Sequence, residues 1–469
     1  MFEILLVIFP VLMAFIFLAL GKDRKELIRA LLVILGVVQL AGHCAIVIFP
    51  QYNQAWCPNY IDSDIYGIII NTIVSLVFSC ATIFSMTWIG SVQRFEAGIH
   101  MMKEHRFAAL MSLFLASMTL VGFARNFGLL WIAIEATTLL SAPLICFQRT
   151  KGALEAMWKY LLICSLGIGL ALFGIFFLDV AFAGNHGGLS FDSLASASNI
   201  NTQWCKVAFI FCFAGFGLKM GLAPFHNWLP DAYSESASPV AALMSAGLIN
   251  CSFLAILRVL SVMPIQLAKF YKEFMIIFGV LSLLTAAFFM IHQIDYKRML
   301  AYSSVEHMGI LSILWALDAK EMAILHMCMH SMLKMLLFFV AGNIALAYVS
   351  TKVKAVNGMI NRMPLNAVLW GLGILMICGM PPSPLFISEF YLIKNAGPIL
   401  GGIVIVLLFT IFAAMTKNMM SMALGKDPLT EFRPRYQVAD KLAVLPAVLM
   451  AIPLLIGIYL LINFTGGIL

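Results

Sequence analysis

The chain has 469 residues, of which 62% are hydrophobic and only 11% are charged, with a formal net charge of +7. A water-soluble domain with this balance would expose very large apolar patches, so the composition predicts a protein whose solvent is lipid. The positive charge needs no nucleic-acid partner, because the basic residues lie mainly in the loops between apolar runs. Runs without polar alternation also exclude a membrane β-barrel.

Apolar runs of roughly 20 residues, the length that crosses a bilayer as a helix, recur about fourteen times along the chain. The first run has no basic n-region and no small-residue cleavage site, so we interpret it as a retained helix. The sequence therefore predicts an all-α integral membrane protein. The expected spans are 2–20, 26–49, 66–90, 107–124, 126–147, 156–182, 204–223, 237–262, 273–292, 299–317, 321–349, 366–394, 398–424 and 442–464.

The loops between these spans differ in their basic residues. If the N-terminus lies outside, Lys103, Arg106 and Lys297 all fall in inner loops, whereas the outer loops 50–65 and 183–203 contain no Lys or Arg. Basic residues collect on the cytoplasmic side of a membrane protein. We therefore expect a multi-pass protein of the cell inner (plasma) membrane, with both termini on the outer, periplasmic face.

Two of the expected spans are interrupted by proline. The seventh runs into Pro224, and the twelfth contains Pro381 and Pro382. Proline removes a backbone donor and clashes with the preceding turn, so both helices should be discontinuous at membrane depth, although a break can also be a simple packing kink. The two spans lie five helices apart and so run in opposite directions, as an inverted repeat requires. Matching broken helices in inverted halves indicate a transport site.

The expected organisation follows from that repeat. It comprises 1–106 with helices 1–3, 107–262 as the first five-helix inverted repeat, 263–424 as the second, and 425–469 with helix 14.

Three charged residues lie where the sequence predicts bilayer interior, at a cost of about 2.5–3.5 kcal/mol each. Glu135 lies in the middle of its span, Lys219 just before the first break, and Glu389 just after the second. Any one of them can be a structural ion pair. Together they favour a hydrated polar axis in the membrane, and lysine suits such a relay because a nearby carboxylate changes its proton affinity. Arg258 lies close to a helix end, so its side chain is expected to reach the interface.

The tenth and eleventh spans add further polar residues. His326, His330 and Lys334 are spaced i, i+4, i+8 and therefore share one helix face. Glu306 and His307 are neighbours in the chain and point in different directions. For His326 alone, a buried histidine bonded to a carbonyl is the commoner explanation. The ten cysteines form no CxxC pair, so we expect no iron–sulfur cluster, zinc site or disulfide.

Four segments carry a family resemblance. They resemble segments of the antiporter-like subunits that respiratory complex I, Mrp cation/proton antiporters and membrane-bound hydrogenases share. The four segments are LKMGLAPFHNWLPDAYSESASPVAALMSAGL, DYKRMLAYSSVEHMG, HSMLKMLLFFVAGN and GMPPSPLFISEF. The resemblance covers roughly 105–425. It implies a fourteen-helix core with two inverted repeats, each providing a proton half-channel, joined by a hydrophilic axis. It also implies no catalytic residue, cofactor or metal in this chain, with electron transfer in partner subunits.

The same resemblance assigns roles to individual residues. It implies that the Glu135 carboxylate pairs with Lys219. His330 and Lys334 resemble the linking pair of the eleventh helix, and Glu389 stands where the family has a terminal lysine or glutamate.

Two positions depart from the complex I pattern. Asn250 replaces a lysine that many complex I members carry on helix 8, which puts the link between half-channels in doubt. Glu306 replaces a small polar residue, and the form SSVEHMG is most similar to component F of hydrogenase-4.

The sequence thus predicts a proton-translocating subunit of a hydrogenase-4-like or complex I-like redox-driven pump, with other membrane and peripheral subunits as partners. One alternative is a subunit of an Mrp-type cation/proton antiporter, and another is a non-conducting scaffold of the same fold, for which Asn250 is the support. The choice between H⁺ and Na⁺ stays open.

Overall fold

The computed structural model describes residues 2–49, 57–95, 101–182, 188–197, 200–425 and 434–466. These residues are nearly all helical and contain isolated β-bridges but no strand. The first ten helices are α1 (Phe2–Leu20), α2 (Lys25–Ile48), α3 (Ile65–Phe95), α4 (Glu104–Phe123), α5 (Phe127–Ile145), α6 (Lys151–Ala181), α7 (Phe191–Ala195), α8 (Thr202–Met220), α9 (Trp228–Glu235) and α10 (Ser238–Leu243). The others are α11 (Ile249–Val262), α12 (Ala268–Ile291), α13 (Tyr296–Ala316), α14 (Lys320–Tyr348), α15 (Met359–Arg362), α16 (Pro364–Ile377), α17 (Pro384–Asn395), α18 (Gly397–Leu424), α19 (Pro434–Lys441) and α20 (Val444–Gly466).

Among these residues, eleven helical spans are long and apolar enough to cross a membrane. The other three expected crossings correspond to α8 and α13, which carry buried charged residues, and to the interrupted pair α16 and α17. The predicted all-α membrane fold is therefore confirmed. The predicted outer loops 50–65 and 183–203 lie partly outside the described residues.

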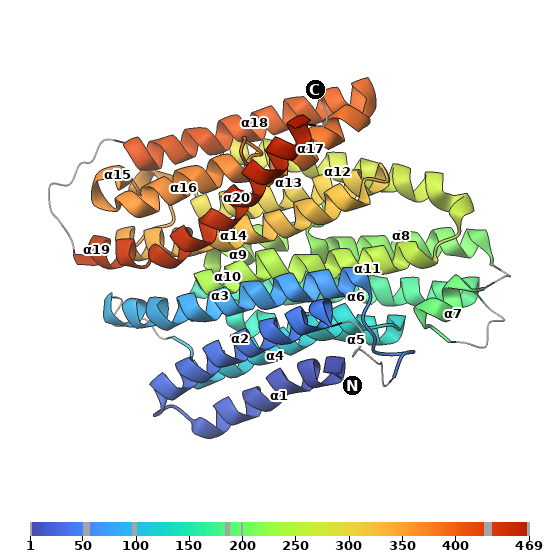
Figure 1. Cartoon of the computed structure of the whole chain (residues 1–469), viewed down its shortest axis with the longest axis horizontal. Coiled ribbons are helices and arrows are strands. Elements are labelled where there is room, and N and C mark those ends of the chain that lie inside the picture. Colours follow the sequence, from blue (N-terminus) through green and yellow to red (C-terminus); the bar gives the residue numbers. More distant parts are fainter. Residues whose placement is uncertain are drawn as a thin grey trace. The chain divides into compact units, whose positions relative to one another are not determined.

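The described residues divide into two compact units. The first belongs to the ranges Met1–Ile83, His100–Gly221 and Gly247–Tyr271. Within it α4 packs against α1 and α2, which run beside it in Figure 1, and α6 packs along α8. The α6–α8 contact is close because a Cβ atom on Gly215 would lie 2.4 Å from the carbonyl oxygen of Gly167. Small residues at such contacts let membrane helices approach closely.

The second unit belongs to the ranges Phe84–Ile99, Leu222–Ala246 and Lys272–Leu469. Its core is α14, which contacts α10, α13, α16 and α17. Most of α14 is buried in protein, so its buried polar side chains must find partners there and not in lipid.

Both predicted helix breaks are present. Between α8 and α9, Gly221 adopts a left-handed φ of 87°, and the Ala223–Pro224 peptide is cis. Between α16 and α17, Gly379 has a φ of 69°, and the Pro381–Pro382 peptide is cis. Glycine adopts positive φ without the steric cost that a side chain would add. The two interruptions therefore have the same composition, a left-handed glycine followed by a cis-proline.

The Arg258 side chain is buried within the protein. Its side chain is only 3% exposed, and its Nη1 and Nη2 atoms each lie 2.5 Å from a carbonyl oxygen, those of Val121 and Gly122. Nη2 also lies 3.6 Å from Oδ2 of Asp64. The last carbonyl groups of a helix have no partner within it. Arg258 therefore supplies donors to the end of α4, a role that its nearness to a helix end could not reveal.

Candidate functional site

The Lys219 ammonium is buried in the last turn of α8. The residue is fully buried, and Nζ donates hydrogen bonds to the carbonyl oxygen of Ile134, at 2.6 Å, and to Oγ1 of Thr138. A charge removed from water persists only where polar atoms replace the water. Both acceptors come from α5, so the α5–α8 contact creates this environment.

Glu135 lies one residue from one of those acceptors. Its Oε1 atom accepts a hydrogen bond of 2.8 Å from Ser165 Oγ, and its Oε2 atom accepts one of 3.4 Å from Thr138 Oγ1. In the part of the chain that the structure describes, no direct ion pair joins Glu135 to Lys219. The pair expected from the resemblance is thus brought together through the hydroxyl of Thr138.

Lys334 has similar surroundings in the second unit. Its Nζ atom, fully buried on α14, donates to the carbonyl oxygen of Leu300 at 2.5 Å and to Oγ of Ser303. Glu306, 2% exposed on α13, interacts electrostatically with this ammonium. Each buried lysine therefore bonds a backbone carbonyl and a hydroxyl on one neighbouring helix, with a carboxylate nearby.

Three histidines meet between α13 and α14. The ring centroid of His307 lies 5.1 Å from that of His326 and 5.0 Å from that of His330. Nδ1 of His307 is 3.0 Å from Nε2 of His326, and Nδ1 of His326 is 2.8 Å from Oγ of Ser388. All three histidines are fully buried. The predicted polar face of α14 is therefore turned toward α13, and His326 bonds side chains instead of a carbonyl.

The donors and acceptors of the hydrogen bonds from His307 through His326 to Ser388 can be assigned. The Ser388 hydroxyl donates to the carbonyl oxygen of Leu385, at 2.8 Å, so it accepts from an N–H at His326 Nδ1. In a neutral His326 ring, Nε2 is then an acceptor, and His307 donates to it from Nδ1. Both ring nitrogens of His330 have no hydrogen-bond partner among the described residues, and the His307 ring also interacts with the backbone of Ile377. A proton added to the His307 ring would thus have an exit through Nδ1.

Glu389 borders this cluster from α17. It is 7% exposed, and Oε1 has no hydrogen-bond partner in the described part of the chain. Its ligand atoms and those of His307 and His326 all lie within 4.8 Å of one another. Two imidazoles and a carboxylate can bind protons, and the same groups are ligands of divalent metals such as Zn²⁺. The sequence predicts no metal here, and the chain of ring nitrogens favours proton exchange.

The Gly379 break also positions Glu389. A Cβ atom on Gly379 would lie 2.0 Å from Oε2 of Glu389, so the absence of a side chain leaves room for the carboxylate. Gly379→Ala should therefore displace Glu389 and strain the positive φ. Because small misplacements of reacting groups are costly, we expect proton translocation per assembled complex to fall on the order of tenfold.

The control for that substitution is Gly371→Ala in α16, where the nearest side-chain atom, Met419 Sδ, would lie 3.9 Å from the new Cβ. Proton uptake by sealed membrane vesicles measures both variants. Equal, wild-type uptake by the two would contradict the positioning role of Gly379.

Several polar residues of the site were not singled out from the sequence. Each of three such residues lies within three positions of a predicted residue in the sequence, and this nearness could have identified them. They are Thr138, Ser303 and Ser388. Ser165 has no such signal, because it comes from α6. Asn250 is fully buried in α11, directly after a π-helical turn at Met244–Leu248. Such turns are frequent at functional sites.

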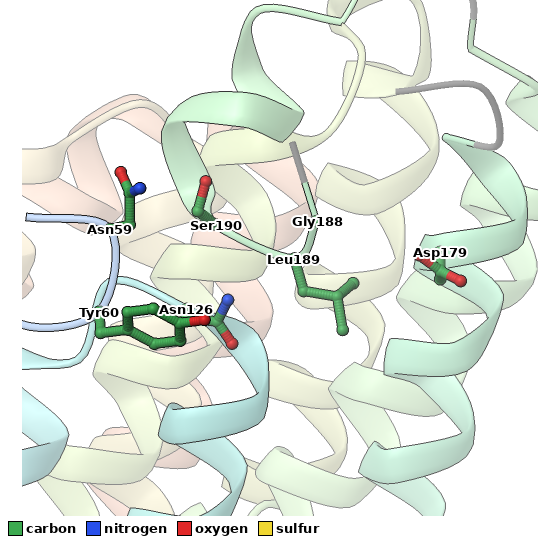
Figure 2. A pocket seen from close by; sticks show the side chains of 7 residues that line it. All are labelled: Asn59, Tyr60, Asn126, Asp179, Gly188, Leu189 and Ser190. Carbon is green, nitrogen blue, oxygen red and sulfur yellow. The ribbon is translucent and has the colours of Figure 1, made fainter. Parts of the chain in front are cut away.

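A separate pocket of about 440 Å³ opens in the first unit. Figure 2 shows Asn126, at the start of α5, and Asp179, on α6, among its side chains. Glu135 lies in the middle of α5, so this pocket does not contain the residues predicted from the sequence. The lining consists of Asn59, Tyr60, Asn126, Asp179, Gly188, Leu189 and Ser190.

Comparison with known sequences gives a consistent result. A family model described as "NADH:quinone oxidoreductase/Mrp antiporter, TM" matches residues 124–416. The hydrogenase-4 component F homolog of Methylacidiphilum infernorum is 35% identical over 66% of this chain and 68% of its own length. Subunit N of the F420H2 dehydrogenase of Methanosarcina mazei is 31% identical over 59% of each chain. The NADH-quinone oxidoreductase subunit N of Desulforudis audaxviator is 30% identical, over 56% of this chain and 53% of that protein.

Solved structures share the fold. A chain of the membrane-bound sulfane sulfur reductase, an archaeal respiratory membrane complex, gives a TM-score of 0.86 at 20% identity, covering 99% of this chain and 95% of its own. A chain of the Mrp complex from Dietzia sp. gives 0.85 at 18% identity, covering 98% and 95%. A chain of respiratory complex I from Thermus thermophilus gives 0.75 at 21% identity, covering 97% and 98%.

Proposed function

We propose that this chain, which belongs to the NADH:quinone oxidoreductase/Mrp antiporter family, is a proton-translocating membrane subunit of a redox-driven pump of the hydrogenase-4 or complex I type. The observation that supports it most is the environment of the two buried lysines. Each ammonium bonds one carbonyl and one hydroxyl, with a carboxylate nearby but not bonded directly. A lysine held by neutral groups gives up its proton more easily than one locked to a carboxylate.

The two inverted repeats are proposed to divide this work. The first, 107–262, contains Glu135 and Lys219, and the second, 263–424, contains the histidines and Glu389. The regions 1–106 and 425–469 flank them. Protons would pass through the titratable groups of each repeat. The transport assay would also show whether the transported ion is Na⁺ instead of H⁺.

The partners are proposed to be redox subunits. Hydrogenase, F420H2 dehydrogenase and NADH-quinone oxidoreductase are named among the relatives, which favours a redox drive over the gradient-driven Mrp alternative. Moving one charge against 100 mV requires about 2.3 kcal/mol, and these subunits would supply it. Glu135 is only partly buried in the middle of α5, so a neighbouring membrane subunit would shield it from lipid. The complex would lie in the inner membrane, with both termini of this chain on the outer face.

Glu135→Gln tests this function. The amide keeps nearly the same volume, its oxygen can accept from one of the two hydroxyls of Ser165 and Thr138, and its NH2 group can donate to the other, so assembly should be normal. The loss of the negative charge removes the group that receives the proton from Lys219, and we expect proton uptake to fall on the order of a hundredfold. Native gels would measure assembled complex, and mass spectrometry of the purified complex would identify its other subunits.

The matched control is Glu155→Gln on α6, whose side chain is 67% exposed and pairs with Lys159. Exposed pairs of this kind contribute little, so uptake should stay at the wild-type level. Normal assembly and normal uptake in Glu135→Gln would refute the proposed function, and poor assembly would indicate that the carboxylate has a structural role. Small Mrp subunits among the partners would favour the Mrp reading.

A further inference from the structure

The Thr138 hydroxyl lies between the two charged groups of the first unit. It accepts a hydrogen bond from Lys219 Nζ and lies 3.4 Å from Oε2 of Glu135 and 3.5 Å from the carbonyl oxygen of Ile134. A hydroxyl has a single hydrogen, so it donates to one acceptor at a time, and the Tyr160 hydroxyl is a further neighbour of Thr138.

The carbonyl of Ile134 has other donors. It accepts from Lys219 Nζ at 2.6 Å and from Thr137 Oγ1 at 2.7 Å, and its place within α5 also gives it a backbone N–H donor. Three donors already share the two lone pairs of this carbonyl oxygen, so it is a poor acceptor for the Thr138 hydrogen. Oε2 of Glu135, by contrast, has Thr138 as its hydrogen-bond donor among the described residues. The ionised carboxylate is therefore the stronger acceptor for the hydroxyl hydrogen.

We infer that Thr138 is the relay residue that carries a proton between Lys219 and Glu135, an inference that rests on the proposed function. In this step an N–H bond of the Lys219 ammonium breaks as Thr138 Oγ1 takes that proton. The original O–H bond of Thr138 breaks as its proton passes to Glu135 Oε2. The products are a neutral amine, a neutral carboxylic acid and an intact hydroxyl, so charge and atoms balance. The reverse transfer restores the ammonium and the carboxylate.

Thr138→Val tests the inference because valine has nearly the shape of threonine but no hydroxyl. Proton uptake per assembled complex should fall on the order of tenfold or more. Thr138→Ser keeps the hydroxyl and should restore uptake to nearly the wild-type rate. A purely structural loss of packing would not be rescued in this way, since serine lacks the methyl group.

The matched control is Thr72→Val in the same unit. The Thr72 hydroxyl bonds the carbonyl oxygen of Ile68 within α3, at 2.8 Å, so its removal should leave uptake unchanged. If Thr138→Val does not assemble, Thr138→Ala is measured in its place with the same expected loss. Failure of both to assemble while Thr138→Ser assembles would overturn the relay in favour of a structural bond.

Glu135→Gln and Thr138→Val, measured side by side, separate this inference from the proposed function. Wild-type uptake by Thr138→Val with lost uptake by Glu135→Gln would overturn the relay alone. Wild-type uptake by both would overturn the relay and the proposed function together.

Discussion

Lys219→Met is expected to abolish proton translocation while the complex still assembles. Methionine has a similar length and is apolar, so it fills the same fully buried space without a charge. Replacing a buried charge by a well-packed apolar side chain is often neutral for stability. The group that gives its proton to Thr138 is lost, however, and we expect uptake per assembled complex to fall on the order of a hundredfold or more. Sealed inverted vesicles supplied with the electron donor of the complex give this measurement.

Lys206→Met is the matched control, on the same helix. Lys206 is exposed near the start of α8, and its Nζ atom lies 5.6 Å from the centroid of the Phe270 ring. This contact is far along α8 from Lys219, so uptake should remain at the wild-type rate. Wild-type uptake by Lys219→Met would show that the buried ammonium carries no protons. Loss of the assembled complex would mean that Lys219 mainly supports the α5–α8 contact.

Much of the fold could be predicted from the sequence because lipid imposes a simple rule. Each crossing needs roughly 20 apolar residues, and the helices end where glycine and proline occur together, at Gly221 with Pro224 and at Gly379 with Pro382, whereas α5 continues through Pro143. The burial of Arg258 could not be predicted, since it depends on where α4 ends relative to α11. The π-helical turn at Met244–Leu248 was also not predictable, because neither composition nor periodicity distinguishes it from an α-helical turn.

The charged residues of the site could be singled out for the same reason. A charge within an apolar run is costly, and the helical spacing of His326 and Lys334 placed them on one face. The hydroxyls that connect these groups could not be chosen in advance. Thr72 on α3 bonds its own backbone, at Ile68, as such residues often do in helices, whereas Thr138 links two charged side chains. Only the packing of neighbouring helices separates the two cases.

His307→Asn is expected to interrupt the second unit's chain of bonds. The Nδ2 atom of asparagine occupies nearly the position of histidine Nδ1, so the hydrogen bond to His326 Nε2, 3.0 Å long in the wild type, can persist. Asparagine cannot take up a proton at a second nitrogen and release one from the first, which the imidazole of His307 can do. Assembly should therefore be normal, and proton uptake should fall on the order of a hundredfold.

His43→Asn provides the comparison. His43 is also fully buried, and its Nδ1 atom lies 2.9 Å from the carbonyl oxygen of Gln39 and 2.8 Å from Oγ of Ser75. The same substitution there removes an imidazole from a membrane helix without touching the chain from His307 to Ser388. If both variants lose uptake equally, the loss reflects the removal of a buried histidine as such. If only His307→Asn loses uptake, a proton that crosses the second unit has to enter at one ring nitrogen of His307 and leave from the other. Wild-type uptake by His307→Asn would exclude that route.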